Sequence, residues 1–169
     1  DLFRQSEPLV ALNKGSFSDP RVTVVNADAA RWLEDAGSDD DSAMFDAVIV
    51  DFPDPSNFSL GKLYSVPFYR GLARHVAARG LVVVQSTSPY FAPRAFWSID
   101  ATLKEAGFKT WPYHVYVPSF GEWGCVFASK EAGFTPPEPY RLPMRFLDAP
   151  TTRDLFRFAA DMPRPQGGP

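Results

Sequence analysis

The sequence has few of the residues that cross-link small proteins or bind metals. Its 169 residues include one cysteine, Cys125, and two histidines, so a disulfide framework is impossible and a structural zinc site is not expected. No apolar run approaches the roughly 20 residues that a bilayer-spanning helix requires. Lys and Arg number 17 against 20 Asp and Glu, which gives a net charge of −3 without a basic patch. Binding to nucleic acid is therefore not expected, whereas the acidic balance suits a cationic small molecule.

The composition that remains is that of a folded domain. Hydrophobic residues make up 45% of the chain and aromatic residues 15%, which is enough for a sizeable core and excludes disorder over most of the length. The first residue is not Met, and no signal peptide follows it, so we expect the chain to be cut from something longer. Residues 163–169 are expected to form a frayed tail.

Helix and strand patterns alternate along the first 130 residues. The spacing of apolar residues predicts helices over residues 2–13, 29–34, 65–78 and 93–106. β-branched and apolar runs predict strands over residues 22–25, 45–50 and 81–84, the second of them buried on both faces. Two further strands, residues 110–117 and 124–129, are too close in sequence for a crossover helix and should pair antiparallel. The alternation predicts an α/β fold with a doubly wound, mostly parallel sheet.

Three other segments carry simpler expectations. Residues 131–169 are rich in proline and read as an arm with a short helix over residues 152–160. The acidic stretch over residues 37–42 is expected to be a solvated turn. His75 lies in a helix rich in arginine and is expected at the surface, while His114 alternates with apolar residues in a strand and has no partner nearby in sequence.

Polar residues follow three of the predicted strands, at the sheet edge where α/β folds bind ligands. Asp28 follows the first strand and could accept a hydrogen bond from an amino group or a ribose, or simply cap the next helix. Asp51 and Asp54 follow the second strand in a turn stiffened by two prolines. This pair could bind an amine and take its proton, although Asx turns or a weak divalent-metal site would also explain it.

The third strand end and the hairpin offer further candidates. Gln85, Ser86 and Ser88 could orient a ligand or form an ordinary polar loop. Most of the aromatic residues are expected in the core. Phe120 and Trp123 differ because glycines flank their loop, so they could form the wall of a pocket for an alkyl amine or a nucleoside.

Four segments together resemble the polyamine aminopropyltransferases, the spermidine synthase family. They are VNADAARWL over residues 25–33, FDAVIVDFPDPSNFSLGKLYS over 45–65, GLVVVQSTSPYFAPRAFW over 80–97 and YVPSFGEWGCVFASK over 116–130. The resemblance is strongest to bacterial members whose catalytic domain follows a membrane-embedded region. It implies a Rossmann-like, methyltransferase-type sheet over residues 1–130, and transfer of an aminopropyl group from decarboxylated S-adenosylmethionine to a diamine such as putrescine, giving spermidine and methylthioadenosine.

The resemblance also implies a role for each candidate residue. Asp51 would be the catalytic residue that deprotonates the attacking amine, and Asp54 would bind the amine. Gln85 would lie beside the diamine, and Phe120 would stand in the amine pocket where many relatives place a tyrosine; Trp123 stays a candidate wall of that pocket on the residue pattern alone. Asp28, with Ala29 beside it, would contact the adenine of the co-substrate. No bound cofactor and no metal are implied.

The resemblance does not include the first elements of the family's catalytic domain. The family's glycine-rich loop and the acidic end of its second strand are not in this chain, which would therefore be the C-terminal part of the catalytic domain. Two family strands would lie between residues 22–25 and the rest of the sheet, so we expect a gap or an unprotected edge and no turnover by this fragment alone. A homo-oligomer, a cytoplasmic location and a full-length protein associated with the inner membrane are further expectations.

Two other functions stay open at this point. One is an S-adenosylmethionine-dependent methyltransferase, which shares the fold; the pair Asp51 and Asp54 argues against it, because many methyl acceptors need no such charge. The other is a ligand-sensing or assembly domain without catalysis, in which the arm from Thr135 onward makes dimer contacts.

Overall fold

The structure is a computed structural model that describes residues 2–36, 44–131, 133–138 and 140–165. The chain divides into two compact units, Asp1–Trp32 and Leu33–Pro169. The acidic stretch expected as a turn lies outside the described residues. The division expected near residue 130 stays a prediction.

The first unit contains short helices followed by an extended segment. Its elements are α1 (Leu2–Gln5), α2 (Glu7–Asn13), the 3₁₀ turn η1 (Ser16–Ser18) and the start of α3 (Ala29–Ala36). Pro8 lies in the first turn of α2, so the helical stretch predicted over residues 2–13 is interrupted just before this proline. The strand predicted over residues 22–25 is wrong: the segment is extended but pairs with no strand among the described residues, and Val25 is 57% exposed. A β-branched run becomes a strand only when a neighbour bonds its backbone groups.

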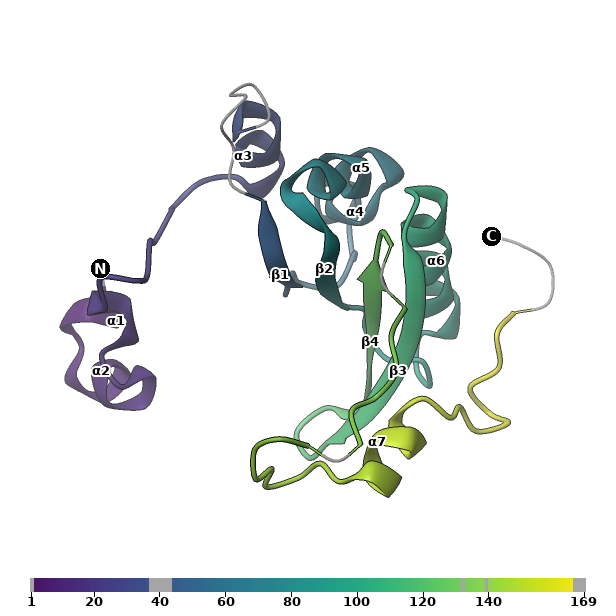
Figure 1. Ribbon diagram of the computed structural model, residues 1–169. Helices are drawn as coiled ribbons and strands as arrows, with labels where there is room; N and C mark the ends of the chain where they lie inside the picture. The colour runs from purple at the N-terminus through teal and green to yellow at the C-terminus, as the bar shows by residue number, and fades with distance from the viewer. Residues whose placement is uncertain (1, 37–43, 132, 139, 166–169) are drawn as a thin grey trace. The chain divides into compact units, whose positions relative to one another are not determined.

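The second unit is a four-stranded sheet with helices and the C-terminal arm packed on it (Figure 1). Its strands are β1 (Phe45–Val50), β2 (Val76–Gln85), β3 (Lys109–Val117) and β4 (Gly121–Ser129), in the spatial order β1-β2-β4-β3. Its other elements are α4 (Phe58–Gly61), η2 (Lys62–Tyr64), α5 (Val66–His75), α6 (Pro93–Glu105) and α7 (Ala149–Leu155). β1 and β2 are parallel, whereas β4 is antiparallel to both of its neighbours. Three strands therefore run in one direction, as the predicted mostly parallel α/β sheet with a terminal hairpin requires.

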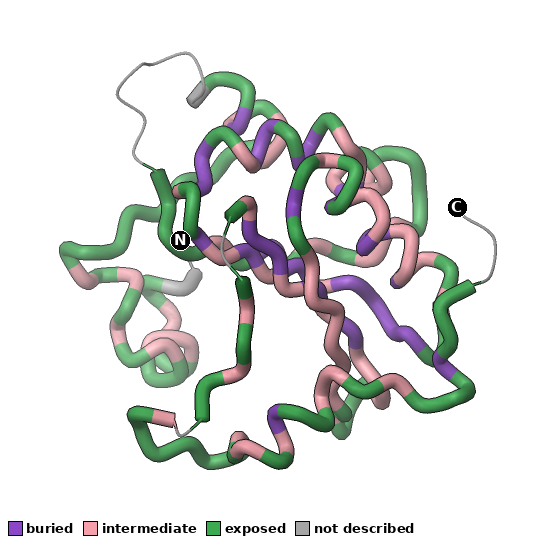
Figure 2. Tube along the Cα trace, turned by 45° about the vertical axis from the view of Figure 1, so that its right-hand side comes forward, coloured by how far each residue is buried: buried purple, intermediate pink, exposed green. Residues whose placement is uncertain are grey.

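One face of the sheet carries the core. Val82, Val84 and Val126 are fully buried on this face, where α5 and α6 pack together. Figure 2 shows the buried residues concentrated along these strands and helices. Phe96 of α6 lies so close to Gly124 that a Cβ there would be 2.4 Å from the ring. The sheet and the helix layer therefore meet without space for a side chain at this point.

β1 differs from its prediction, because it is an edge strand rather than a central one. It was expected to be buried on both faces, yet Phe45 is 41% exposed and Ile49 is 80% exposed. In the described part of the chain β1 pairs only with β2, and Ile49 projects from the face opposite to the helices. The outer side of β1 is therefore without a partner strand among the described residues.

The junction between α5 and β2 also differs from the prediction. The helix ends at His75, three residues before the expected end, and the strand begins at once. Val76 is β-branched, fully buried and paired with β1, so the sheet determines its conformation. His75 is buried rather than exposed, and its Nε2 lies 3.1 Å from the carbonyl oxygen of Leu33.

The arm folds back onto the hairpin and onto α6. Its helix α7 begins earlier than expected because the Asp148 carboxylate accepts a hydrogen bond from the Thr151 amide over 2.7 Å. Hydrogen bonding with the side chain of Thr151, and then with its amide, lowers the pKa of Asp148. The helix ends at Leu155 rather than at residue 160, and two rings follow it: Phe156 packs against Tyr113, and Phe158 packs against Phe96.

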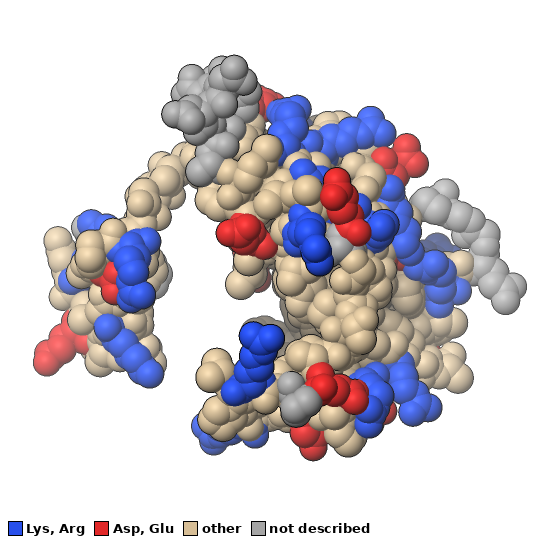
Figure 3. Space-filling view, in the orientation of Figure 1, with Lys and Arg blue, Asp and Glu red and all other residues tan. Residues whose placement is uncertain are grey.

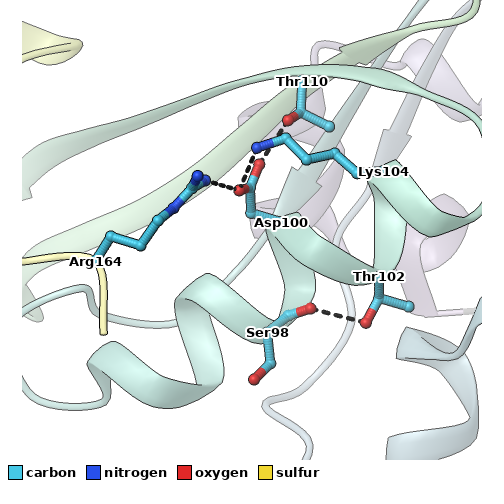
Figure 4. Close-up of polar contacts among 6 residues, drawn as sticks. All are labelled: Ser98, Asp100, Thr102, Lys104, Thr110 and Arg164. Atoms are coloured by element: carbon cyan, nitrogen blue, oxygen red, sulfur yellow. Dashed lines mark hydrogen bonds and ion pairs between the residues drawn. The ribbon is translucent and has the colours of Figure 1, made fainter. Parts of the chain in front are cut away.

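A buried carboxylate in α6 anchors the end of the arm (Figure 4). Asp100 is 1% exposed and accepts hydrogen bonds from Lys104 over 2.8 Å and from Thr110 over 2.6 Å. Arg164 of the arm binds the same carboxylate, and its guanidinium lies 4.7 Å from the centre of the Trp97 ring. Three donors therefore compensate the buried charge, and one of them comes from a residue 64 positions away.

None of the helices in the described ranges is long and apolar enough to cross a membrane.

Candidate active site

The candidate site lies where β1 and β2 end. Because these strands are parallel, Asp51 and Gln85 come to the same edge of the sheet. β3 ends at this edge too, so the β3–β4 turn that carries Phe120 lies on the same side. The fold therefore brings together at one edge the hairpin loop and two of the three strand ends that the sequence indicated.

Asp54 is held by two neutral donors from the end of β2. Gln85 Nε2 donates to Oδ1 over 3.2 Å, and Thr87 Oγ1 donates to Oδ2 over 2.9 Å. Both oxygens of the carboxylate are thus positioned by one segment, while each keeps a second lone pair for a ligand. An Asx turn, one of the alternatives considered for Asp51 and Asp54, does not explain these two hydrogen bonds, because the partners lie more than 30 residues away along the chain.

Asp51 has a different environment. Its side chain is exposed and makes no hydrogen bond or ion pair with any residue that the structure describes. Its negative charge nevertheless acts within the site: burial is the main cause that raises the pKa of Tyr64 and of the Cys125 thiol, and the charge of Asp51 adds to it. The exposed carboxylate oxygens of Asp51 are therefore open to a ligand.

Tyr64 is a site residue that the sequence analysis assigned to the core. Its hydroxyl lies 3.1 Å from the carbonyl oxygen of Phe52, 3.2 Å from that of Pro53 and 3.2 Å from Gln85 Oε1. Burial, followed by the charges of Asp54 and Asp51, raises its pKa to about 12. The hydroxyl is therefore a hydrogen-bond donor at neutral pH, and it joins the proline turn to Gln85. No motif around Tyr64 indicated this role.

Phe120 and Trp123 contact each other, with ring centres 5.2 Å apart. Phe120 lies in the turn and is 63% exposed, whereas Trp123, expected in the loop, lies in β4 opposite Val115. Two residues further along β4, Cys125 faces Gln85 across the sheet. The two rings therefore form an aromatic surface close to the edge that carries the carboxylates.

Asp28 caps a helix, one of the two roles considered for it. Its Oδ1 accepts a hydrogen bond from the Arg31 amide over 3.0 Å, and Ala29 is the first residue of α3. Both residues lie in the first unit and are described within it. A capping carboxylate retains lone pairs for a further donor, so the cap leaves the proposed ligand contact open.

His114 has partners that its sequence position concealed. Its Nδ1 lies 2.8 Å from Glu122 Oε2, and its Nε2 lies 2.8 Å from the carbonyl oxygen of Arg157. Glu122 is a diagonal neighbour across the hairpin, because His114 pairs directly with Gly124. The histidine therefore connects both strands of the hairpin to the arm.

The described residues contain no metal-binding cluster, and on the face that Figure 3 shows acidic residues lie among the basic ones. No group of three or more His, Cys, Asp or Glu residues in the described part of the chain could hold a metal ion. Figure 3 shows Lys and Arg gathered at the upper right of one face, with Asp and Glu between them.

The chain is similar in sequence to known proteins. The model of the spermine/spermidine synthase domain matches residues 1–136. A curated protein named polyamine aminopropyltransferase 2, from Ralstonia nicotianae, is 67% identical over 99% of this chain and 32% of its own length. Polyamine aminopropyltransferase 1 from Streptomyces coelicolor is 47% identical over 96% of this chain and 30% of its own length. The chain thus spans about a third of the curated relatives that it matches.

Solved structures share the fold. The spermidine synthase of Thermotoga maritima has a TM-score of 0.72 and 19% identity, over 94% of this chain and 53% of that one. A spermidine synthase in complex with the transition-state analogue AdoDATO has a TM-score of 0.71 and 20% identity, over 92% of this chain and 56% of that one.

Proposed function

The chain belongs to the spermine/spermidine synthase domain family, and from this premise we propose that it supplies the amine-activating part of a polyamine aminopropyltransferase. The reaction is transfer of an aminopropyl group from decarboxylated S-adenosylmethionine to a diamine such as putrescine, giving spermidine. The single observation that carries the proposal is the pair Asp51 and Asp54, one exposed and the other fixed by Gln85 and Thr87 at the same strand end. Because the chain spans about a third of its curated relatives, the activity is proposed for the full-length protein.

The chemistry requires two carboxylates with different tasks. A diamine arrives as an ammonium ion, whose nitrogen has no lone pair for attack. Asp54 binds this cation in a fixed position, and Asp51 accepts one proton from the nitrogen. The nitrogen then forms a bond to the carbon next to the sulfonium, the carbon–sulfur bond breaks, and sulfur keeps the electron pair as neutral methylthioadenosine. The positively charged sulfur is already an activated leaving group, so the protein's task is to align the two reactants and exclude water.

The remaining site residues have positioning roles in this proposal. Gln85 lies beside the diamine and fixes Asp54, while Phe120 and Trp123 contact the hydrocarbon part of the amine or the nucleoside. Phe120 lacks the hydroxyl that a tyrosine would offer there. Asp28, with Ala29, receives the adenine end of the co-substrate. The co-substrate is consumed in the reaction and leaves as methylthioadenosine, so it is not a bound cofactor. The homo-oligomeric state, the cytoplasmic location and the membrane association of the full-length protein stay predictions.

The test compares two variants of the full-length protein. Asp51→Asn keeps the shape but cannot accept the proton, so kcat should fall by about 10²–10⁴-fold while donor binding is unchanged. Asp54→Asn removes charge from the cation site, so the KM for putrescine should rise by about 10–100-fold. Asp46→Asn, on the exposed start of the same strand, is the control and should leave both constants unchanged.

Two results would overturn the proposal. Tighter binding of intact than of decarboxylated S-adenosylmethionine would favour methyl transfer, and no turnover with any diamine would favour a binding or assembly role. We also propose that residues 1–169 alone do not catalyse the transfer; turnover by the purified fragment would refute that part.

A further inference from the structure

Thr87 has a backbone conformation that its side chain disfavours. Its φ is 59°, in the left-handed region, and the residue is 6% exposed. A β-branched residue rarely adopts this conformation, because its Cβ substituents crowd the backbone, whereas glycine adopts it without strain. The strain must therefore be compensated by interactions around Thr87.

The backbone of Thr87 is fixed against β4. Its carbonyl oxygen accepts a hydrogen bond from the Gly124 amide over 2.7 Å, and the carbonyl oxygen of Gly124 accepts one from the Ser86 amide over 2.9 Å. A Cβ at position 124 would lie 2.8 Å from the Thr87 carbonyl oxygen, so only glycine permits this approach. The two bonds continue the β2–β4 pairing beyond Gln85 and hold residues 86 and 87 in place.

The result of this conformation is a hydroxyl aimed at the site. Thr87 Oγ1 donates to Asp54 Oδ2 over 2.9 Å, while Gln85 Nε2 donates to the other oxygen over 3.2 Å. Two donors on two oxygens prevent rotation of the carboxylate, so its remaining lone pairs keep one direction. Asp51 has no such support among the described residues, as suits a group that must accept and release a proton.

We propose that Thr87 is a positioning residue, which fixes the Asp54 carboxylate for the acceptor ammonium, and that its strained backbone is retained for the sake of this hydroxyl. The inference rests on the proposed function and adds to it a residue that acts through Asp54. Glycine at position 87 would relieve the strain, but it would leave one oxygen of Asp54 without its donor. Stability and amine binding should therefore respond in opposite directions to that substitution.

The experiment uses the full-length protein with decarboxylated S-adenosylmethionine and putrescine. Thr87→Val keeps the branched shape and removes the hydroxyl, so the KM for putrescine should rise about tenfold while the KM for the donor changes less than about twofold. Thr87→Ser restores the hydroxyl and should return the putrescine KM to within about threefold of the unaltered protein. Thr110→Val removes the same kind of bond, from a threonine to Asp100, and should leave both KM values unchanged.

Thr87→Gly separates positioning from a purely structural role. It should melt at the same or a higher temperature than the unaltered protein and still show the raised putrescine KM, and it serves as the test if Thr87→Val does not fold. An unchanged putrescine KM in the folded variants, or a failure of Thr87→Ser to restore it, would overturn the inference and leave the proposed function intact. Absence of turnover in the unaltered protein would overturn the proposed function, and the inference with it.

Discussion

The hydroxyl of Tyr64 lies 3.2 Å from Oε1 of Gln85, the residue whose Nε2 donates to Asp54. A single side chain before α5 therefore determines which way the Gln85 amide faces, because an amide whose oxygen accepts from Tyr64 must turn its nitrogen toward the carboxylate. The same hydroxyl lies near the carbonyl oxygens of Phe52 and Pro53, between the two aspartates.

Tyr64→Phe should lower the free energy of unfolding by about 1–2 kcal/mol at neutral pH, because it removes the one O–H donor that three partly buried acceptors share. The loss should depend on pH. The pKa of Tyr64 is raised from 10.0 to about 12, so the folded state holds the phenolic proton more tightly than the unfolded state. Its contribution to stability is complete below pH 10 and is lost as the pH rises through about 12.

Urea unfolding of both proteins across this range provides the measurement, and the difference between them should narrow as the pH rises. Burial also raises the pKa of Tyr69 and of Tyr113, but both residues are present in the two proteins and cancel in the difference. A difference that stays constant would mean that Tyr64 contributes only through packing.

Gly124→Ala should lower the free energy of unfolding by about 1–3 kcal/mol, because the new methyl group would overlap the Phe96 ring and the Thr87 carbonyl oxygen. Phe96 is fully buried and the second neighbour is backbone, so neither can move aside easily. Gly133→Ala is the matched control: nothing lies within 4 Å of the place that its new methyl group would take, and its stability should stay within about 0.5 kcal/mol. Equal stability of the two variants would contradict the close approach of α6 to β4.

Arg164→Gln should loosen the end of the arm more than it destabilises the whole protein. Lys104 and Thr110 still bind Asp100, so we expect a loss of about 1 kcal/mol together with faster proteolytic cleavage beyond α7. Limited proteolysis followed by mass spectrometry measures the cleavage. Arg145→Gln, an exposed arginine of the same arm, should be cleaved at the rate of the unaltered protein; a matching increase there would assign the effect to surface charge.

Trp123→Ala should raise the KM for the amine or for the nucleoside co-substrate about tenfold, because it removes one of the two rings near the carboxylate edge. Trp111→Ala is the comparison, since Trp111 belongs to the same hairpin but packs against Phe134 of the arm. Steady-state kinetics and thermal melting of both variants separate the two roles. Lowered stability with unchanged KM values in Trp123→Ala would make Trp123 a packing residue.

The sequence predicted well the features that depend on neighbouring residues. The helix from Pro93 and the β3–β4 hairpin are confirmed, because proline position, apolar spacing and a short link are local signals. The meeting of Asp54 with Gln85 follows from one general property of parallel sheets, that adjacent strands end at the same edge.

Features that depend on distant partners were missed. Residues 22–25 have the composition of a strand but no neighbour to bond among the described residues, and composition alone does not reveal that. Asp100 obtains one of its donors from a residue 64 positions away, and Glu122 reaches His114 only through the diagonal register of the hairpin. Nothing in the sequence indicated the left-handed backbone of Thr87, because a β-branched residue is the last type expected at a positive φ.

The open side of β1 has a consequence for the purified chain. Ile49 is 80% exposed beside backbone groups that no strand bonds among the described residues, and such an edge acts as a template for another copy. Self-association should therefore grow steeply with protein concentration, and Ile49→Lys should raise the concentration at which turbidity begins. Association through this edge would withdraw monomer as the concentration rises, so assays of residues 1–169 should give concentration-independent results only in dilute solution.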